Sequence, residues 1–483
     1  MPAPFPARGA PTSCIQAGGT PLQAGTVEVL RQGDCAGFSI MRYLLKDATA
    51  VTLHPVAIER TSLRIDRGRV IERGDSLEPR EGEEVLYLGR KIVIPGLVCG
   101  HTHLYSALSR GMPPPATPPE SFTAILKLIW WRMDRALDEE SIYYSALAGA
   151  LDAARAGTTC LFDHHSSPGQ ITGSLNLVRK AIETVGLRAV LCYEITDRGG
   201  SLLRDEGLQE SRAFLESIKG ELQSPNEAGA SLVRGMVGAH ASFTLTAESI
   251  EACAELMRRY DSGLHIHAGE DSCDVEDARA KYNMGPVARL ARHGALNRRT
   301  ILAHGTHLDE RDIRIARDVG AWFVHNPRSN MNNQVGYAPV GRFGKRVALG
   351  TDGIGADMFE EARFAFFKAR DARSGLGAAE CVSWLANNQR VASDAFGIEL
   401  GNLIPGSAAD LIVLDYDPPT PVTAANLPWH FVFGMQSASV RSVMVNGKFV
   451  IKDGKSALDE TEIHATARRV SQKLWGKFRA IRD

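Results

Sequence analysis

The chain has 483 residues, and its 55 basic and 56 acidic residues leave a net charge of −1. That balance provides no broad attraction to nucleic acid or anionic lipid, so neither is expected as a partner and any charged site must be local. Apolar residues make up 44% of the chain, which excludes wholesale disorder, and no apolar run reaches the about 18 residues of a membrane span.

Residues 1–40 are rich in Pro, Gly and Ala and show no periodicity, which predicts a mobile N-terminal extension. Arg8 is the only basic residue near the start and no apolar core follows it, so the segment does not resemble a secretory signal. Met41 is an alternative start of the native protein. The eight cysteines are scattered without a CxxC pair, which fits a reducing compartment and predicts a cytoplasmic protein.

Both ends of the remaining chain are rich in short strands. Residues 41–95 contain strand-like runs broken by turn signals, and residues 403–458 show the same pattern with a hairpin signal at Asn446-Gly447. These two pieces predict one small composite β-sandwich domain built from both chain ends. Residues 459–483 have helical periodicity and predict a C-terminal helix packed on the outside.

Residues 96–402 predict an α/β fold, a (β/α)₈ TIM barrel. Short apolar runs alternate there with longer helical stretches, and eight such units in about 300 residues are typical of this barrel. The expected strands are Ile92–Val98, Thr158–Phe162, Arg188–Tyr193, Gly235–Gly238, Gly263–Ile266, Thr300–Ala303, Trp322–Val324 and Arg346–Leu349.

Histidines and acidic residues follow these strands one after another. In a barrel the strand ends converge on the C-terminal face, where active sites are built. The residues concerned are His101, His103, Asp163, His164, His165, Glu194, His240, His267, Glu270, His304, His325 and Asp352.

The pair His101-Thr-His103 predicts a metal site. Alternation along a strand turns both imidazoles to the same side, although two ordinary strand histidines are the simpler alternative for this pair alone. Together with His267 and Asp352 they make three imidazoles and a carboxylate, a ligand set for Zn²⁺ or, alternatively, Fe²⁺. His240, and not a lysine, ends the fourth strand, which favours one divalent ion over two.

Glu270, His304 and Asp352 are the predicted catalytic residues. Glu270 follows His267 by three residues, which places an acid beside a water whose pKa a metal lowers to about 7. Asp352 is expected to ligate the metal and to accept a proton, and His304 to polarise the substrate or orient the nucleophile. The alternatives are a helix cap for Glu270, a turn residue for Asp352 and an indirect role for His304.

Five further residues are candidates with weaker support. His240 and Arg328 are expected to contact the substrate, although Arg328 could instead pair with a local carboxylate. His265 is a rival metal ligand, but a buried position one layer deeper is favoured for it. The roles of the neighbouring His164 and His165 stay open.

These motifs together resemble the amidohydrolase superfamily. Pro95-Gly96 before His101-Thr-His103, then His267-Ala-Gly-Glu270, Leu302-Ala-His304-Gly and Gly350-Thr-Asp352-Gly are similar to its deaminase and chlorohydrolase branch. Within that branch the resemblance is greatest to aminohydrolases of the SsnA group, through Asp163–Pro168, His240–Leu245, His325–Asn332 and Gly350–Phe359. It covers about Met41 to the C-terminus.

The resemblance implies a barrel with a small β-sandwich, one divalent metal on the four ligands above, and Glu270 with His304 as the proton-transfer pair. Cys99-Gly100 differs from many relatives, which have Asn or Asp two residues before the first histidine.

The sequence therefore predicts a metal-dependent aminohydrolase. It would hydrolyse a carbon–nitrogen bond of a purine-, pyrimidine- or triazine-like small-molecule heterocycle and release ammonia, as cyclic amidine deaminases do. A cyclic-amide hydrolase or chlorohydrolase with the same site is the alternative, and a catalytically silent scaffold is disfavoured by the intact Glu270 and Asp352. The specific heterocycle and the formation of a homo-oligomer stay open.

Overall fold

A computed structural model describes residues 42–89, 91–222 and 231–481 of the chain. The predicted extension of residues 1–40 lies outside the described residues. Within them, no helix is long and apolar enough to cross a membrane.

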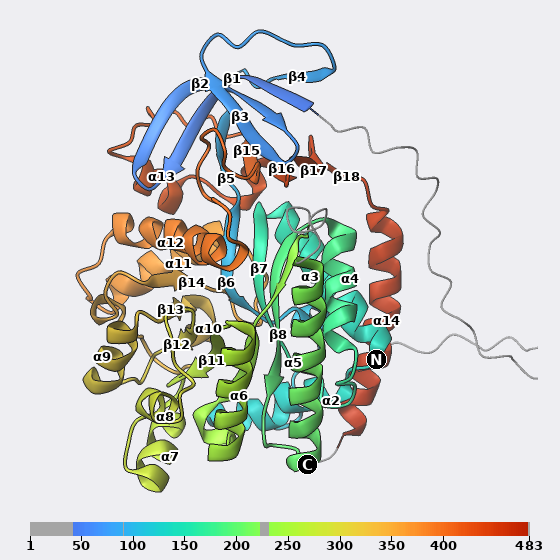
Figure 1. Cartoon of the computed structure of the whole chain (residues 1–483), viewed down its shortest axis with the longest axis vertical. Helices are drawn as coiled ribbons and strands as arrows, with labels where there is room; N and C mark the ends of the chain where they lie inside the picture. Colours follow the sequence, from blue (N-terminus) through green and yellow to red (C-terminus); the bar gives the residue numbers. More distant parts are fainter. Residues whose placement is uncertain (1–41, 90, 223–230, 482–483) are drawn as a thin grey trace, which may run out of the picture. The chain divides into compact units, whose positions relative to one another are not determined.

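The central part of the chain folds into a parallel barrel, as predicted (Figure 1). Its strands, in spatial order, are β6 (Leu97–Thr102), β7 (Thr158–His165), β8 (Arg188–Ile195), β10 (Val237–Ala241), β11 (Leu264–Ala268), β12 (Ile301–His304), β13 (Trp322–His325) and β14 (Val347–Leu349), and the short β9 (Val233–Gly235) pairs with β8. A parallel bridge between Thr102 and Asp352 links the chain after β14 back to β6. This bridge brings the first and last strand ends together.

Amphipathic helices cover the outside of the barrel because parallel strands need both faces buried. They are α3 (Glu139–Arg155), α4 (Ser174–Val185), α5 (Ser201–Leu222), α6 (Ala247–Tyr260), α7 (Ser272–Tyr282), α8 (Pro286–Arg292), α9 (Glu310–Val319), α11 (Met358–Asp371) and α12 (Ala378–Phe396). The short helix α10 (Pro327–Asn332) follows β13 and is largely buried. Between β6 and α3 the chain forms η1 (Leu104–Ser109), α1 (Phe122–Ile125), the π-helical turn η2 (Leu126–Trp130) and α2 (Trp131–Ala136). This β6–α3 segment supplies much of the apolar wall of the site described below.

A second sheet combines strands from both ends of the chain. Its order is β18 (Lys455–Ser456), β17 (Lys448–Lys452), β16 (Val440–Val445), β15 (Leu411–Leu414), β5 (Ile92–Pro95), β1 (Arg42–Leu53), β2 (Val56–Asp66) and β3 (Arg69–Gly74), and β4 (Glu83–Tyr87) pairs with β1. The early strand β5 and the late strand β15 pair antiparallel, so neither end of the chain completes this sheet alone.

One predicted strand is wrong as a single element. The run Ile92–Val98 divides at Gly96 into β5 of the second sheet and β6 of the barrel. A Cβ atom at Gly96 would lie 2.2 Å from the Oγ1 of Thr159, so only glycine allows the backbone to pass this close to β7. The hydrophobic run indicates that this stretch is buried and extended. It does not indicate that the chain passes from one sheet to the other at Gly96.

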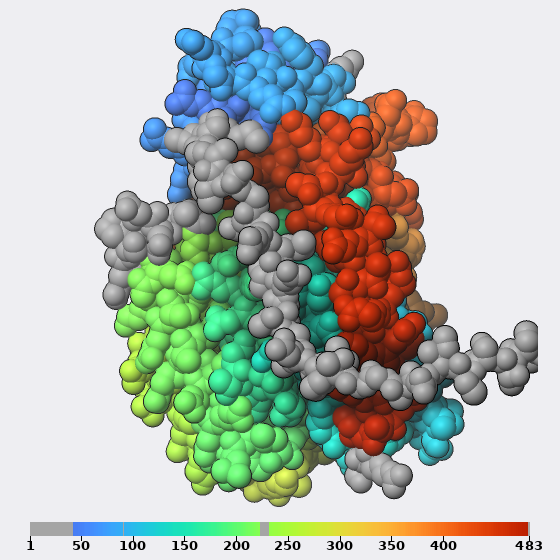
Figure 2. Space-filling model, turned by 90° about the vertical axis from the view of Figure 1, so that its right-hand side faces the viewer, coloured from blue at the N-terminus to red at the C-terminus, as the bar shows by residue number. Residues whose placement is uncertain are grey.

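The two sheets are joined by a buried ion pair. Arg188, at the start of β8, places its Nε 2.7 Å from Oδ2 of Asp410, which precedes β15. Two further helices, α13 (Leu427–Phe433) and α14 (Glu460–Ala480), complete the C-terminal part. Helix α14 packs against α3, and Figure 2 shows it as the red segment beside the teal and cyan part of the barrel.

Candidate active site

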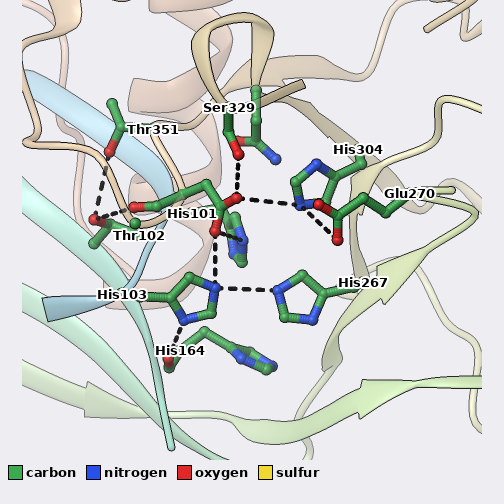
Figure 3. A network of polar contacts seen from close by, with 12 residues as sticks. His101, Thr102, His103, His164, His267, Glu270, His304, Ser329 and Thr351 are labelled. Carbon is green, nitrogen blue, oxygen red and sulfur yellow. Dashed lines mark hydrogen bonds and ion pairs between the residues drawn. The ribbon is translucent and has the colours of Figure 1, made fainter. Parts of the chain in front are cut away.

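The four predicted metal ligands converge at the carboxyl ends of the barrel strands. His101 belongs to β6, His103 caps η1 immediately after it, His267 belongs to β11, and Asp352 follows β14 (Figure 3). Nε2 of His103 lies 3.1 Å from Nε2 of His267 and 3.0 Å from Oδ1 of Asp352. Nε2 of His101 lies 3.7 Å from the same Oδ1. Ligand atoms about 2 Å from a common ion have such separations.

Backbone carbonyls set the tautomers of two of these imidazoles. His103 donates from Nδ1 to the carbonyl of His164 at 2.5 Å, and His267 donates from Nδ1 to the carbonyl of His240 at 2.8 Å. Because a carbonyl only accepts, each neutral ring has its hydrogen on Nδ1 and a lone pair on Nε2. The two Nε2 atoms therefore face each other as acceptors, an arrangement that a shared cation stabilises.

His101 completes the acceptor cluster. Its Nδ1 lies 2.8 Å from Nε2 of His265, while its own Nε2 is fully buried without a hydrogen-bond partner among the described residues. Burial would raise the pKa of Asp352, but its interactions with the nearby imidazoles of His101 and His103 outweigh burial and hold that pKa well below its usual range. The donor set thus fits a divalent metal ion.

Asp352 strongly affects the ionisation of His103. Burial by itself would lower the pKa of His103, yet the hydrogen bond and charge of Asp352 raise it to about 9. Without a metal, a proton on His103 would supply the positive charge that the carboxylate needs.

Two overlapping groups of potential ligands occur among the described residues. The ligand atoms of His101, His267, His304 and Asp352 all lie within 4.8 Å of one another, and so do those of His103, His164, Glu194 and His267. The first group contains three of the predicted ligands. His103 belongs to the second group but contacts both His267 and Asp352 at the distances given above.

The predicted proton-transfer residues surround one small gap beside this cluster. Nε2 of His304 lies 3.7 Å from Oε2 of Glu270 and 3.9 Å from Oδ2 of Asp352. Nδ1 of His304 lies 2.8 Å from Oδ1 of Asn330, which places the ring hydrogen there and leaves Nε2 as an acceptor. A water beside these three acceptors can donate its two hydrogens to two of them.

Burial shifts the pKa of Glu270 into the range that proton transfer at neutral pH requires. It raises the pKa of this carboxyl to about 7, where an acid can both take and return a proton at neutral pH. His304 and Asp352 also have positive φ values of 71° and 55°. Such left-handed backbone is unusual for residues other than glycine and is concentrated at functional sites.

A pocket lies next to the histidine cluster and the catalytic carboxylates. Aromatic and apolar side chains of the β6–α3 segment form one wall: Tyr105, Phe122, Leu126, Trp130 and Trp131. The polar lining includes Asp134, Glu194 and His240. His240 donates from Nδ1 to Oγ1 of Thr244 at 2.7 Å, because that hydroxyl donates in turn to the carbonyl of Ala241. Its Nε2 is therefore an acceptor for a ligand.

Arg328 is not brought into this pocket. Its guanidinium donates to Glu361 at 2.5 Å and to the carbonyl of Gly355 at 2.8 Å, and it also pairs with Glu360. This arrangement matches the local-pairing alternative for Arg328 and gives no support to substrate contact. The next residue, Ser329, instead donates a hydrogen bond to Oδ2 of Asp352.

The remaining strand-end histidines lie around the cluster. Nε2 of His164 faces two carbonyls at 3.1 Å, those of Ala239 and His265, and its Nδ1 lies 3.3 Å from Oε2 of Glu194. Nε2 of His165 lies 2.9 Å from the hydroxyl of Ser167.

Ser329, Asn330 and Asn333 are not among the site residues that the sequence predicts. These residues contact Asp352, His304 and Glu270 respectively. The polar run after His325 was part of the resemblance, and its unusual density of Asn is the only signal that could have indicated them.

A (β/α)₈ barrel with histidines and carboxylates gathered at its strand ends has the architecture of a barrel metal-dependent hydrolase. The chain belongs to the amidohydrolase family, whose model matches residues 92–450.

The chain is similar to several proteins with an assigned name. A 5′-deoxyadenosine deaminase of Methanopyrus kandleri is 30% identical over 448 residues, covering 90% of this chain and 99% of that protein. A 5-methylthioadenosine/S-adenosylhomocysteine deaminase of Desulforudis audaxviator is 29% identical over 450 residues, with 90% and 99% covered. A zinc-bound adenosine deaminase structure from Xanthomonas campestris has a TM-score of 0.77 at 22% identity, covering 91% of this chain and 99% of that one.

These comparisons confirm three predictions: the family, the barrel with an additional sheet, and a hydrolase that acts on carbon–nitrogen bonds.

Proposed function

We propose that this hydrolase is a metal-dependent deaminase that replaces the exocyclic amino group of an aminopurine nucleoside by oxygen and releases ammonia. The observation that carries the proposal is the convergence of Glu270, His304 and Asp352 around one gap beside the histidine cluster. The names of the relatives, deaminases of 5′-deoxyadenosine and of 5-methylthioadenosine or S-adenosylhomocysteine, favour a purine among the heterocycles considered.

His101, His103, His267 and Asp352 would hold one divalent ion. Imidazoles with one carboxylate suit zinc, and Fe²⁺ is the alternative that metal analysis would distinguish. When bound, such an ion lowers the pKa of water to about 7 and so supplies a nucleophile at neutral pH.

The chain's own residues then move the protons. Glu270 and Asp352 accept the two hydrogens of the attacking water, and Nε2 of His304, which lies 3.7 Å and 3.9 Å from their oxygens, limits where that water can lie. The water oxygen forms a bond to the amino-bearing ring carbon while the adjacent ring nitrogen takes a proton from Glu270. The proton accepted by Asp352 then passes to the amino group, the carbon–nitrogen bond breaks, and ammonia leaves.

The pocket lining supports a flat, uncharged ring. Trp130 and Trp131 line the pocket with aromatic surface, and Nε2 of His240 can accept a hydrogen bond from a ring substituent. Asp134 and Glu194 add negative charge to the same pocket, although Arg198 pairs with both. An anionic group held close to the heterocycle would be repelled there.

Ammonia release by the zinc-reconstituted chain tests the proposal. The substrates would be adenosine, 5′-deoxyadenosine, 5-methylthioadenosine and S-adenosylhomocysteine, with cytosine, guanine and an aminotriazine for comparison. We expect turnover of at least one 6-aminopurine nucleoside and none by Glu270→Gln on the same timescale. Turnover confined to the pyrimidine or triazine, or hydrolysis of a cyclic amide without ammonia, would overturn the proposed substrate class.

A further inference from the structure

One short segment of the chain contacts both catalytic carboxylates. Ser329 lies in the single-turn helix α10, and Asn333 follows that helix directly. The hydroxyl of Ser329 donates to Oδ2 of Asp352, and Figure 3 shows Ser329 close to His304 at the top of the network. The amide nitrogen of Asn333 donates to Oε1 of Glu270 at 3.2 Å and to the hydroxyl of Ser329 at 3.4 Å.

These contacts form one continuous chain of hydrogen bonds, Asp352–Ser329–Asn333–Glu270. Both connecting side chains are buried, Ser329 at 3% and Asn333 at 6% exposure. Asn332 donates to Oδ1 of Asn333 at 3.0 Å, which fixes the amide so that its nitrogen faces Glu270. Inside a protein such a fully connected network restricts the rotation of every group in it.

The network gives the two oxygens of each carboxylate different partners. In Asp352, Oδ2 accepts from Ser329 and also lies 3.9 Å from Nε2 of His304, while Oδ1 faces Nε2 of His103 at 3.0 Å. In Glu270, Oε1 is bound by Asn333 while Oε2 faces Nε2 of His304 at 3.7 Å. Each carboxylate is thus held through one oxygen and presents the other to the cluster or to the gap.

We propose that Ser329 and Asn333 are positioning residues that couple the orientations of Asp352 and Glu270 for the reaction. The inference rests on the proposed function, because it assigns these residues to the proton transfers described there. Neither side chain belongs to the predicted metal ligands. They act on the two carboxylates, so at saturating zinc their loss should lower kcat and leave substrate KM nearly unchanged.

Kinetics of Ser329→Ala and Asn333→Ala, both loaded with zinc, test this assignment. A small misplacement of catalytic groups costs up to about 100-fold in rate, so we expect kcat of each variant to fall about 10- to 100-fold with KM changed less than about threefold. Ser329→Thr, which keeps the hydroxyl, should retain most of the activity. Gln334→Asn is the matched control because Gln334 is exposed on the same segment.

The double variant examines the coupling itself. If both residues act through one network, Ser329→Ala/Asn333→Ala should lose clearly less than the product of the two single losses. Multiplicative losses, single variants within twofold of wild type, or a loss of zinc from Asn333→Ala at saturating zinc would overturn the proposal. A purely structural role would lower the amount of folded enzyme without this selective change in kcat.

A crystal structure of each zinc-loaded variant provides a readout that does not depend on activity. We expect the carboxylate plane of Asp352 to turn in Ser329→Ala and that of Glu270 to turn in Asn333→Ala. If wild type releases no ammonia from any purine, the proposed function fails, but the crystal structures still decide the positioning role. Unmoved carboxylates in both variants would overturn it.

Discussion

Nδ1 of His101 lies 2.8 Å from Nε2 of His265, and both rings are buried to within 1% exposure. When both rings are neutral, His101 carries its hydrogen on Nδ1 and donates it to Nε2 of His265. Nε2 of His101 then has a free lone pair, which is directed toward Asp352. His265 thus lies behind the predicted ligand, in the deeper layer that the sequence analysis favoured.

We predict that His265→Leu weakens metal binding without removing a ligand. Partners that orient a ligating histidine typically contribute about 10- to 100-fold to metal affinity, so zinc should be lost to a competing chelator at about 10- to 100-fold lower chelator concentration. His293→Gln is the control, because that ring bonds Glu251 near the surface. An affinity equal to wild type would contradict the role assigned to His265.

Glu270 and His267 should respond differently to substitution. Glu270→Gln keeps the shape of the side chain but removes the proton carrier, and general acid–base catalysis contributes about 10²–10⁴-fold, so ammonia release should fall at least that far with zinc retained. His267→Ala removes a ligand and should lose zinc and activity together. Metal analysis beside the ammonia assay checks both, and zinc loss in Glu270→Gln would refute the separation.

Much of the site could be predicted because its residues follow regular strands. Alternation places His101 and His103 on one side of the chain, and the parallel barrel carries His267 and Asp352 to the same face. Such arguments need only local periodicity and one global rule. The change of sheet at Gly96 could not be predicted, because it depends on contact with Thr159, far away in the sequence.

The side-chain directions of Arg328 and its neighbours could not be predicted for the same reason. Their directions depend on a short helix whose packing against α11 the local pattern does not reveal. The side chain of Arg328 turns to Glu361, whereas Ser329 and Asn333 turn to the catalytic carboxylates. A polar run without strand or helix periodicity shows that polar contacts exist but not which residue makes each one.

The buried carboxyl of Asp312 should make stability depend on pH. This residue of α9 accepts a hydrogen bond from the backbone of Ala288 at 2.9 Å through Oδ1, while Oδ2 has no hydrogen-bond partner among the described residues. Burial raises its pKa to about 6 from an ordinary value of 3.8. Because the folded state disfavours the charged form, stability falls as pH rises from about 4 through about 6.

Asp312→Asn removes this titration while keeping the acceptor oxygen. We predict that the free energy of unfolding of the variant, relative to wild type, increases by about 2 kcal/mol between pH 4 and pH 7. Denaturant unfolding at several pH values measures the difference. Asp318, on the same helix, is exposed, so Asp318→Asn should show no comparable change. If the free energy of unfolding changes equally with pH in both variants, the buried carboxyl of Asp312 is not the cause of the pH dependence.

The second sheet should require both chain ends. Ending the chain at residue 402 removes β15 to β18 and leaves β5 without its antiparallel partner. An open edge and newly exposed apolar residues favour aggregation, so the shortened protein is expected to be insoluble. A soluble product with cooperative thermal unfolding would mean that residues 41–95 fold without the late strands.

The ion pair between Arg188 and Asp410 should be the strongest polar link between barrel and second sheet. Arg188 is 1% and Asp410 4% exposed, and the backbone of Asn446 also donates to Asp410 at 2.9 Å. Arg188→Met leaves a buried carboxylate without its cation, which typically costs about 3–5 kcal/mol. The exposed pair of Arg441 and Asp453 is the matched control, where Arg441→Met should cost less than about 1 kcal/mol.

Denaturant unfolding of both variants measures this contrast. In the double variant Arg188→Met/Asp410→Leu no buried charge remains, so much of the lost stability should return. If Arg188→Met costs no more than Arg441→Met, the buried pair does not stabilise the junction. If the double variant is as unstable as the sum of its single variants, the cost comes from lost packing and not from an unpaired carboxylate.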